Sequence, residues 1–448
     1  MLFHQFVDDD LGCASYLVGD PATGECVAVD PAFWIEPYLE EAARRGARIV
    51  RVLETHNHAD HVSGHGRLAL EHGVPLSIHA AAGATYAHDS LADGDLIELG
   101  QIRVQVLHTP GHRPEHCAFA VIDRSRGDEP WIVLTGDSLL VGDTARPDLA
   151  VEAREGAEEL YFSLRKLLEL GDGVEVFPGH VSGSLCGTRM SSKASTTIGF
   201  ERRFNAALSR TELDEFVTES ARISAPRPPG LERIVELNRG PFVAAPPELE
   251  PLAEAGDSVV LDVRPAAAFV AGHVPGAINV PVSGSSFATK AGFVLLQEER
   301  VVLHATYEEE ARRAARGLHS VGFLDVAGWL ASPDTSASTE VARVDELERL
   351  LADGEAQLID VREKDERDAG YIPGTRHIPY RLLRSGAVHA LDRDKPVVTL
   401  CESGARAAIA ASILAAAGFD AHPVLEGGIG AWQSAGGQTV EFRRCGGS

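Results

Sequence analysis

Seven histidine and aspartate side chains follow four strand-like runs in the first half of the chain. They are His56, His58, Asp60, His61, His112, Asp137 and His180. Because strand ends can meet at one edge of a sheet, we expect these side chains to converge although they are spread over positions 56–180. Neutral imidazole and carboxylate groups bind Zn, Fe, Mn or Ni. The sequence therefore predicts a metal centre at a sheet edge, and the spacing is compatible with one metal ion or with two.

A cysteine near the C-terminus carries a second chemical signal. Cys401 directly follows the apolar run 397–400, and the Ala-rich stretch 407–417 predicts a helix. A thiol in that position faces backbone N–H groups and a helix N-terminus, and both favour the nucleophilic thiolate. Gly404 lets the loop turn tightly, and Arg406 adds a positive charge. We therefore expect Cys401 to be a nucleophile.

The metal-ligand candidates lie in the first of three predicted blocks, residues 1–240. The strand-like runs that precede their turns are 49–54, 102–107, 131–134 and 174–177. A helical stretch at 199–220 and a proline-rich breaker at 226–230 follow these strands. The composition of this block, which holds most of the chain's 18 histidines, points to imidazole chemistry.

The second and third blocks, 241–338 and 339–448, form an internal repeat. The Asp-Val-Arg motif that begins at Asp262 recurs at Asp360, 98 residues later, and a Pro-Gly turn recurs at the same offset. Each copy has about 100 residues, an ordinary domain size. Short apolar strands alternate with Ala-rich helices in both copies, which predicts a parallel α/β sheet.

The middle block departs from its partner at the cysteine. Ala305 aligns with Cys401, and the block contains no cysteine at all. Glu308 and Glu310 stand where the third block has a glycine and an arginine. Carboxylates in such a loop would repel anionic sulfur species and raise the pKa of any thiol there. We therefore expect a catalytically silent domain that serves as a scaffold or an interface.

Composition and charge exclude several classes of protein. The chain has 66 acidic and 41 basic residues, a net charge of −25, which disfavours binding to nucleic acid. No apolar stretch approaches the roughly 18 residues that would span a membrane. The N-terminus has neither the basic nor the apolar region of a signal peptide, and the six cysteines are scattered. A cytoplasmic protein is expected.

The motif from His56 to His61, with His112, Asp137 and His180, resembles the metallo-β-lactamase fold superfamily over roughly residues 1–220. The resemblance implies an αββα sandwich with metal at one edge. Most members of that superfamily hold two metal ions and hydrolyse esters, thioesters, lactams or phosphodiesters with a metal-bound hydroxide.

Segments around 58–65, 109–116, 136–148 and 178–187 resemble persulfide dioxygenases. That family holds one Fe(II) with two His and one Asp, a facial triad. By motif position the triad is His56, His112 and Asp137. The resemblance places His58, Asp60, His61 and His180 around the iron, or around a second metal in the alternative zinc site, and Arg146 and Asp148 near the thiol-bearing substrate. Cys186 lies near the same edge and is a candidate for a sulfur relay.

The loop Cys401-x-x-Gly-x-Arg406 resembles the active-site loop of rhodaneses, and that family's other motifs match across the third block. The resemblance implies that Cys401 and Arg406 are catalytic. It also implies that the loop residues between them bind substrate; these are Glu402, Ser403, Gly404 and Ala405.

The predicted fold class is α/β, with the N-terminal αββα sandwich followed by two rhodanese-like domains. This order resembles the multidomain persulfide dioxygenase–sulfurtransferases of bacterial sulfide detoxification. The resemblance implies one Fe²⁺ per chain, and a low-molecular-weight persulfide such as glutathione persulfide and O₂ as substrates. The products would be sulfite and thiol, and Cys401 would then form thiosulfate. A homo-oligomer, dimer or tetramer, is also expected.

Two other functions remain open on the sequence. One is a two-zinc thioester hydrolase of the glyoxalase II type fused to a sulfurtransferase, with Asp60, His61 and His180 completing the second zinc site. The other is a sulfur-carrier or sensing module with a non-catalytic metal site. Metal content and the need for O₂ distinguish these from a dioxygenase.

Overall fold

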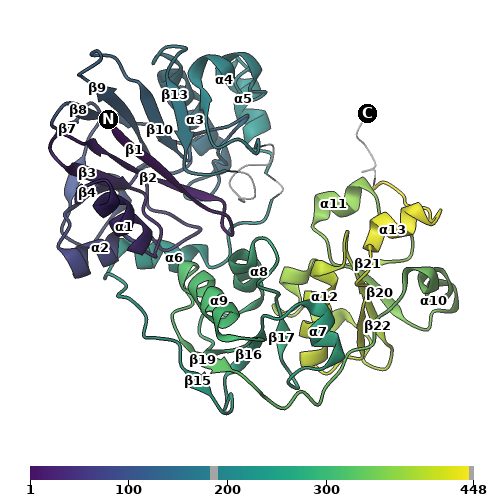
Figure 1. Cartoon of the computed structure of the whole chain (residues 1–448). Coiled ribbons are helices and arrows are strands. Elements are labelled where there is room, and N and C mark those ends of the chain that lie inside the picture. The colour runs from purple at the N-terminus through teal and green to yellow at the C-terminus, as the bar shows by residue number, and fades with distance from the viewer. Residues whose placement is uncertain (182–189, 224, 443–448) are drawn as a thin grey trace. The chain divides into compact units, whose positions relative to one another are not determined.

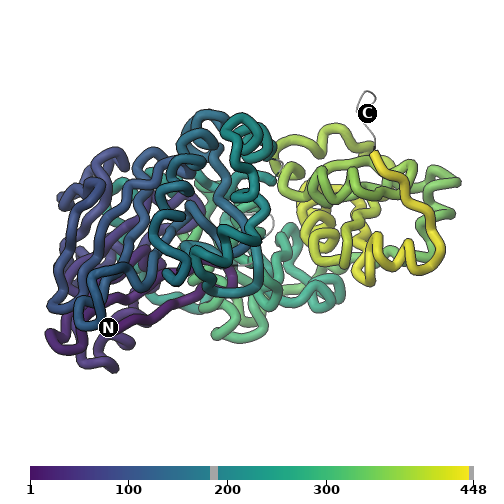
Figure 2. The backbone as a smooth tube through the Cα atoms, turned by 90° about the horizontal axis from the view of Figure 1, so that it is seen from above, coloured from purple at the N-terminus to yellow at the C-terminus, as the bar shows by residue number. Residues whose placement is uncertain are grey.

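Two compact units make up the chain in the computed structural model, which describes residues 1–181, 190–223 and 225–442. One unit contains Met1–Pro246 and His319–Gly322, and the other contains Pro247–Leu318 and Phe323–Ser448. Figure 2 follows the chain from strand β1 in purple to helix α13 in yellow. Among the described helices, none combines the length and the apolar character needed to cross a lipid bilayer.

The first unit is built on two six-stranded sheets (Figure 1). The strands of the first sheet, in spatial order, are β1 (Leu2–Asp8), β2 (Cys13–Asp20), β3 (Glu25–Val29), β4 (Arg48–Leu53), β5 (Leu76–His79) and β6 (Asp89–Leu91). Those of the second are β14 (Thr196–Thr197), β13 (Glu175–Pro178), β10 (Ile132–Gly136), β9 (Cys117–Asp123), β8 (Ile102–His108) and β7 (Leu96–Leu99). A short hairpin, β11 (Leu139–Leu140) and β12 (Asp143–Thr144), follows β10.

The alternation of side chains along β2 shows how the layers form. Tyr16 and Val18 enter the core shared by both sheets, whereas Leu17 between them enters the core beneath helices α1 (Glu36–Arg44) and α2 (His65–His72). Successive residues of a strand point to opposite faces, so both faces of this strand are buried.

The second sheet is covered in the same way by its own helices. Helices α3 (Ala153–Leu168) and α5 (Leu213–Ser220) contribute Leu160, Leu164 and Phe216 to a core on its outer face. The unit is therefore an αββα sandwich, as expected (Figure 1). The metal-ligand candidates follow strands of both sheets.

The stretch 199–220 is not one helix, which corrects the expectation from the sequence. It contains α4 (Ile198–Phe204) and α5, and α4 ends at Asn205. The buried Asn205 amide donates to the Asp143 carbonyl at 3.0 Å and to the Glu201 carboxylate at 2.8 Å. These bonds to the preceding turn and to the β12 hairpin stop the helix, because asparagine competes with the helical backbone for hydrogen bonds. Helix α6 (Leu231–Arg239) follows α5.

The second unit contains two parallel sheets, one in each repeat. In spatial order the first is β15 (Pro251–Leu252), β19 (Val326–Leu330), β18 (Val301–His304), β16 (Val259–Asp262) and β17 (Ile278–Asn279). The second is β21 (Arg376–His377), β20 (Gln357–Asp360), β22 (Val397–Leu400) and β23 (Ala421–Pro423). The helices are α7 (Ala266–Ala271), α8 (Phe287–Val294) and α9 (Glu308–Ser320), then α10 (Leu347–Asp353), α11 (Lys364–Ala369), α12 (Ala405–Ala416) and α13 (Gly428–Ser434).

The two repeats place equivalent residues in equivalent contacts. Arg264 pairs with Asp262 at 2.6 Å, and Arg362 pairs with Asp360 at 2.7 Å. Each arginine also donates to a glycine carbonyl eight residues further along the chain. The sequence repeat is therefore a structural repeat.

Candidate metal centre and sulfur-transfer loop

The ends of four strands deliver the metal-ligand candidates to one edge of the sandwich. His56 follows β4, His112 follows β8, Asp137 follows β10 and His180 follows β13. His56, His112 and Asp137 each offer a ligand atom within 4.8 Å of the other two. All three side chains are buried, with 1% exposure each. These three residues, called the triad below, come from both sheets, so the fold and not local sequence brings them together.

The orientation of His56 follows from a chain of hydrogen bonds. The Thr55 hydroxyl donates to Asp30 at 2.8 Å, and it lies 2.8 Å from His56 Nδ1. A hydroxyl has one hydrogen, so His56 Nδ1 donates to Thr55 and its Nε2 keeps a lone pair. Such a partner on the second ring nitrogen is typical of a metal-ligating histidine.

His112 and Asp137 complete the triad, and the ring of His112 is oriented by a hydrogen bond in the same way as that of His56. His112 Nδ1 donates to the Arg146 carbonyl at 3.0 Å, and its Nε2 lies 3.5 Å from Asp137 Oδ2. Asp137 Oδ2 has no hydrogen-bond partner among the described residues. A buried carboxylate oxygen without a partner is costly unless a cation satisfies it, so the donor set fits a metal ion.

Burial keeps the two imidazoles in their ligating form. It lowers the pKa of His56 well below the usual range, and neighbouring histidines lower it further. Burial also lowers the pKa of His112. For Asp137, burial alone would raise the pKa, but His180 outweighs it and the pKa is lowered. At neutral pH the triad is thus two neutral imidazoles and one carboxylate.

His116 supports Asp137 through the backbone. Its Nε2 accepts the Asp137 N–H at 2.9 Å, and its Nδ1 donates to the Thr109 carbonyl at 3.0 Å. Burial lowers the pKa of His116 to about 3, so the ring stays neutral and can accept that bond.

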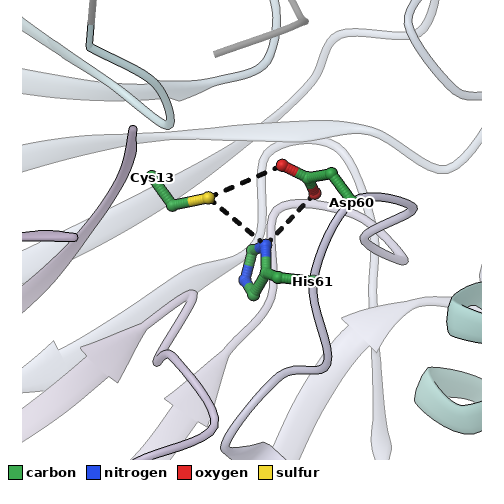
Figure 3. Close-up of side chains that lie close together, drawn as sticks. All are labelled: Cys13, Asp60 and His61. Atoms are coloured by element: carbon green, nitrogen blue, oxygen red, sulfur yellow. Dashed lines mark hydrogen bonds and ion pairs between the residues drawn. The ribbon is translucent and has the colours of Figure 1, made fainter. Parts of the chain in front are cut away.

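His180, Asp60 and His61 form a second group with Cys13 (Figure 3). His180 joins the two groups, because its Nδ1 lies 2.8 Å from Asp137 Oδ1 and its Nε2 lies 2.8 Å from Asp60 Oδ2. Cys13 carries no signal in the sequence. It precedes its partners by 47 to 167 residues, so only the fold identifies it.

His58 lies in a third buried group, with Asp30 and Glu54. Its Nε2 is 3.3 Å from Asp30 and 3.2 Å from Glu54. Burial alone would lower the pKa of His58, but these carboxylates raise it well above the usual range. Glu54 also lies 3.0 Å from His65 Nδ1. Neither carboxylate is marked by the sequence pattern, since both belong to ordinary strand ends.

Arg146 and Asp148 lie beside the triad but bind each other. The Arg146 guanidinium donates to Asp148 at 2.7 and 2.9 Å and to the carbonyls of Ala225 and Pro226. Its donors are therefore engaged within the protein, while its carbonyl orients His112. A substrate-binding role for this pair stays a prediction. Cys186 lies outside the described residues.

In the third block, Cys401 follows strand β22 and is 1% exposed. Its Sγ accepts the Gly404 N–H at 3.1 Å, and its carbonyl accepts the Ile429 N–H at 2.9 Å. Gly404 has φ +100°, and a Cβ there would lie 2.0 Å from the Leu425 carbonyl oxygen. The curled loop thus requires glycine at this position.

Two ion pairs hold the other loop residues. Arg406, near the start of α12, donates to both oxygens of Glu366 at 2.6 Å, and these bonds raise the Arg406 pKa. Glu402 lies 3.3 Å from Arg362. Between them, Ser403 is exposed and Ala405 begins α12. Arg406 is therefore close to Cys401 but is neutralised by a carboxylate.

The middle repeat has the same strand-to-helix turn without the thiol. Ala305 follows β18 as Cys401 follows β22, and it is buried. His304, the residue before it, lies 3.1 Å from Asp262. The sequence of this repeat, residues 241–338, contains no cysteine.

Comparisons with known proteins agree with this architecture. The Metallo-beta-lactamase superfamily model matches residues 8–180, and the Rhodanese-like domain model matches 245–330 and 343–435. Human persulfide dioxygenase ETHE1, mitochondrial, is 30% identical over 50% of this chain and 82% of its own length. The chain belongs to the metallo-beta-lactamase superfamily. It carries two rhodanese-like domains as well.

Other similar proteins extend the comparison. A crystal structure of a metallo-beta-lactamase from Staphylococcus aureus subsp. aureus COL has a TM-score of 0.68 and 29% identity, over 74% of this chain and 98% of that one. The ETHE1 persulfide dioxygenase of Bos taurus is 29% identical over 55% of this chain and 91% of its own length. An uncharacterized protein of Mycobacterium bovis is 31% identical over 46% of this chain and 98% of its own length.

Proposed function

We propose that the N-terminal domain is an iron-dependent persulfide dioxygenase. The observation that carries this is the buried triad, whose imidazoles are neutral and whose second nitrogens are occupied. Two histidines and one carboxylate are the ligand set of non-haem Fe(II) oxygenases. Iron bound there would supply open positions for O₂ and a persulfide sulfur. The similarity to persulfide dioxygenases supports the same substrate class.

The overall reaction balances as R–S–SH + O₂ + H₂O → R–SH + SO₃²⁻ + 2 H⁺. The outer sulfur is oxidised and O₂ is reduced. In this reaction Thr55 and the Arg146 carbonyl keep the ligand nitrogens aimed at one point, and His116 holds the backbone of Asp137. All three ligands are themselves shielded from solvent, with 1% exposure each.

The third block then acts as a sulfurtransferase. The Cys401 thiolate attacks the outer sulfur of a persulfide, R–S–SH + Cys401–S⁻ → R–S⁻ + Cys401–S–SH. Sulfite attacks that sulfur and leaves thiosulfate and the Cys401 thiolate. The Gly404 N–H already points at Sγ and stabilises its negative charge. The fused domains would raise the local concentration of the shared intermediates.

Asp137→Asn tests the metal assignment. It keeps the shape of the side chain but removes the charge that a cation needs. We expect oxygen uptake with glutathione persulfide to fall at least about 100-fold, because loss of a ligand exceeds the 10–100-fold cost of a supporting residue. Iron content per chain should fall with it. Asp128→Asn, at an exposed position, is the control. Wild-type uptake in the Asp137 variant would refute the triad.

Cys401→Ser tests the coupling of the two activities. We expect oxygen uptake to be retained and the product to shift from thiosulfate to sulfite, since the hydroxyl cannot carry sulfane sulfur. Ion chromatography of the products measures the ratio. A matched Cys26→Ala variant removes another buried thiol and should leave the ratio unchanged. Unchanged thiosulfate yield in Cys401→Ser would remove Cys401 from the scheme.

A two-metal thioester hydrolase is the second candidate, because Asp60, His61 and His180 do gather beside Asp137. Hydrolysis of a glutathione thioester under nitrogen, at a rate that oxygen does not change, would favour it. Consumption of O₂ with a persulfide favours the dioxygenase.

A further inference from the structure

The histidines of the first motif lie on a buried loop that contains neither helix nor strand. This loop, residues 54–64 and called the histidine loop below, connects β4 to α2 and carries His56 of the triad. All of its residues are buried except Asp60, which is partly exposed. Buried N–H and C=O groups need hydrogen-bond partners, and an irregular segment cannot supply them all from within itself. Partners for the histidine loop must therefore come from other elements.

Helix α6 supplies several of these partners from a distant part of the chain. Leu231, Val235 and Asn238 lie on one face of the helix, because residues three and four apart follow one another along the same side. Leu231 and Val235 belong with Ala59 to one hydrophobic cluster. The Asn57 side chain donates to the Val235 carbonyl at 3.2 Å. This face of α6 therefore covers the histidine loop.

Asn238 uses its whole side chain on the backbone of the loop. Its Nδ2 donates to the His58 carbonyl at 3.0 Å and to the His61 carbonyl at 2.8 Å. Its Oδ1 accepts the Ser63 N–H at 2.8 Å. An amide has two N–H donors and one carbonyl oxygen, so both donors are used. Neither an aliphatic side chain nor a carboxylate of the same size can make the two donations.

We propose that Asn238 is a positioning residue of the metal centre, which holds the histidine loop in the shape that a cation requires before the cation binds. Its three hydrogen bonds reach backbone atoms, so Asn238 acts on the imidazoles through the loop that carries them. Asn238 is 3% exposed, and its bonds are therefore protected from exchange with water. Residues that orient metal ligands in this indirect way typically contribute about 10–100-fold to metal affinity.

The proposed role extends the metal centre beyond the sandwich. Helix α6 lies outside residues 8–180, the segment that the Metallo-beta-lactamase superfamily model matches. The inference rests on the proposed function only in taking the triad as the metal centre. It does not depend on the substrate or on O₂.

Metal titration of the full-length protein under nitrogen tests the role of Asn238. Co(II) is added in competition with a chromophoric chelator, and the Kd of the first equivalent is measured. We expect Asn238→Ala to raise this Kd at least about 10-fold with the stoichiometry unchanged. Oxygen uptake at saturating Fe(II) should stay near that of the wild type, because the bound metal then holds the loop.

Asn205→Ala is the matched control. Asn205 is also buried, and its side chain also makes two donations and accepts one backbone N–H, that of Ala207. Its partners belong to α4, the turn after it and the β12 hairpin, so none of them is in the histidine loop. Both variants should lose stability, but only Asn238→Ala should lose metal affinity. Asn238→Leu, which fills the volume of the amide, should behave like Asn238→Ala and replaces it if the alanine variant does not fold.

Hydrogen exchange gives a test that also works without a variant. Mass spectrometry of peptides from the histidine loop should show slow exchange in the metal-free wild type. The Asn238 variants should exchange faster until metal is added. Fast exchange in the metal-free wild type, or a wild-type Kd in a folded Asn238 variant, would overturn the proposal.

Persulfide-dependent oxygen uptake is measured on the same wild-type samples. Its absence, together with a metal affinity that depends on Asn238, would reject the proposed dioxygenase and leave the role of Asn238 in place.

Discussion

At the level of single residues, each ligand of the triad is oriented by a neighbouring group that contacts it through an atom other than its expected metal-binding atom. The Thr55 hydroxyl contacts the His56 ring, the Arg146 carbonyl accepts from the His112 ring, and the His116 ring accepts the Asp137 N–H. The result is a set of ligands held in place before any cation binds. Holding the ligands in this way requires several histidines to be buried without charge, which lowers the stability of the folded protein where free histidines would be protonated.

That cost predicts a pH dependence. The pKa of His116 is lowered to about 3, so the unfolded chain binds a proton below about pH 6.5 that the folded protein does not. Each pH unit in this window lowers the free energy of unfolding by about 1.4 kcal/mol for this residue. In the metal-free protein, going from pH 7 to pH 5 should therefore cost the wild type about 2 kcal/mol more than His116→Gln.

Urea unfolding at pH 7, 6 and 5 measures this difference. His72→Gln, on the exposed face of α2, should show the wild-type slope. Equal slopes for wild type and His116→Gln would mean that His116 is charged in the folded protein.

At the level of elements, strand ends and tight turns place the chemistry. The rhodanese loop joins β22 to α12 through a left-handed residue, Gly404, and Gly428 passes so close that an added Cβ would lie 1.9 Å from the Cys401 carbonyl oxygen. The thiol position thus depends on two glycines that leave room for the backbone.

Gly404→Ala should therefore disrupt the loop. The left-handed conformation alone costs a residue with a Cβ about 1–2 kcal/mol, and the contact with Leu425 adds to it. We expect sulfur transfer to fall at least about 10-fold with oxygen uptake unchanged. Gly354→Ala, at φ +60° with no atom within 4 Å of the new Cβ, should lose stability but keep sulfur transfer. Sulfur transfer and oxygen uptake are assayed in parallel for both variants. Full sulfur transfer by Gly404→Ala would contradict the role of this glycine.

At the level of the whole molecule, the middle repeat packs against the third. Helix α12 is almost wholly buried, and its Ser412 Oγ accepts the Asn279 N–H of β17 at 2.9 Å. Arg384 of the third block binds Glu299 of the second at 2.5 and 2.7 Å. The middle repeat therefore contributes a packing surface to the helix that follows Cys401.

Ser412→Ala should reveal the contribution of this contact. It leaves the buried Asn279 N–H without an acceptor, which costs about 1–3 kcal/mol. Ser434→Ala on exposed α13 removes a comparable hydroxyl and should cost less than about 0.5 kcal/mol. Denaturation followed by tryptophan fluorescence, to which Trp329 and Trp432 contribute from the two repeats and Trp34 and Trp131 from the first unit, measures both. Identical midpoints for the two variants would contradict the role of this contact.

The chain itself specified the sandwich, the repeat and the seven metal-ligand candidates, because these leave local marks, whereas only the family resemblance selected the triad among the seven. Strand periodicity, turns that end in His or Asp, and the Asp-Val-Arg repeat are all short-range patterns. The strand expected at 102–107 is β8, Ile102–His108. The missing thiol of the middle repeat is equally visible at Ala305.

The tertiary structure revealed the contacts that no short-range pattern in the sequence indicates. Cys13 and Asp30 gain their partners from segments distant in sequence, and Arg146 turns out to be engaged by Asp148 and two carbonyls. The break at Asn205 depends on a carbonyl in another element. Such contacts depend on the pairing of remote backbones, which side-chain type and spacing do not encode; they arise when the two sheets close on their shared core.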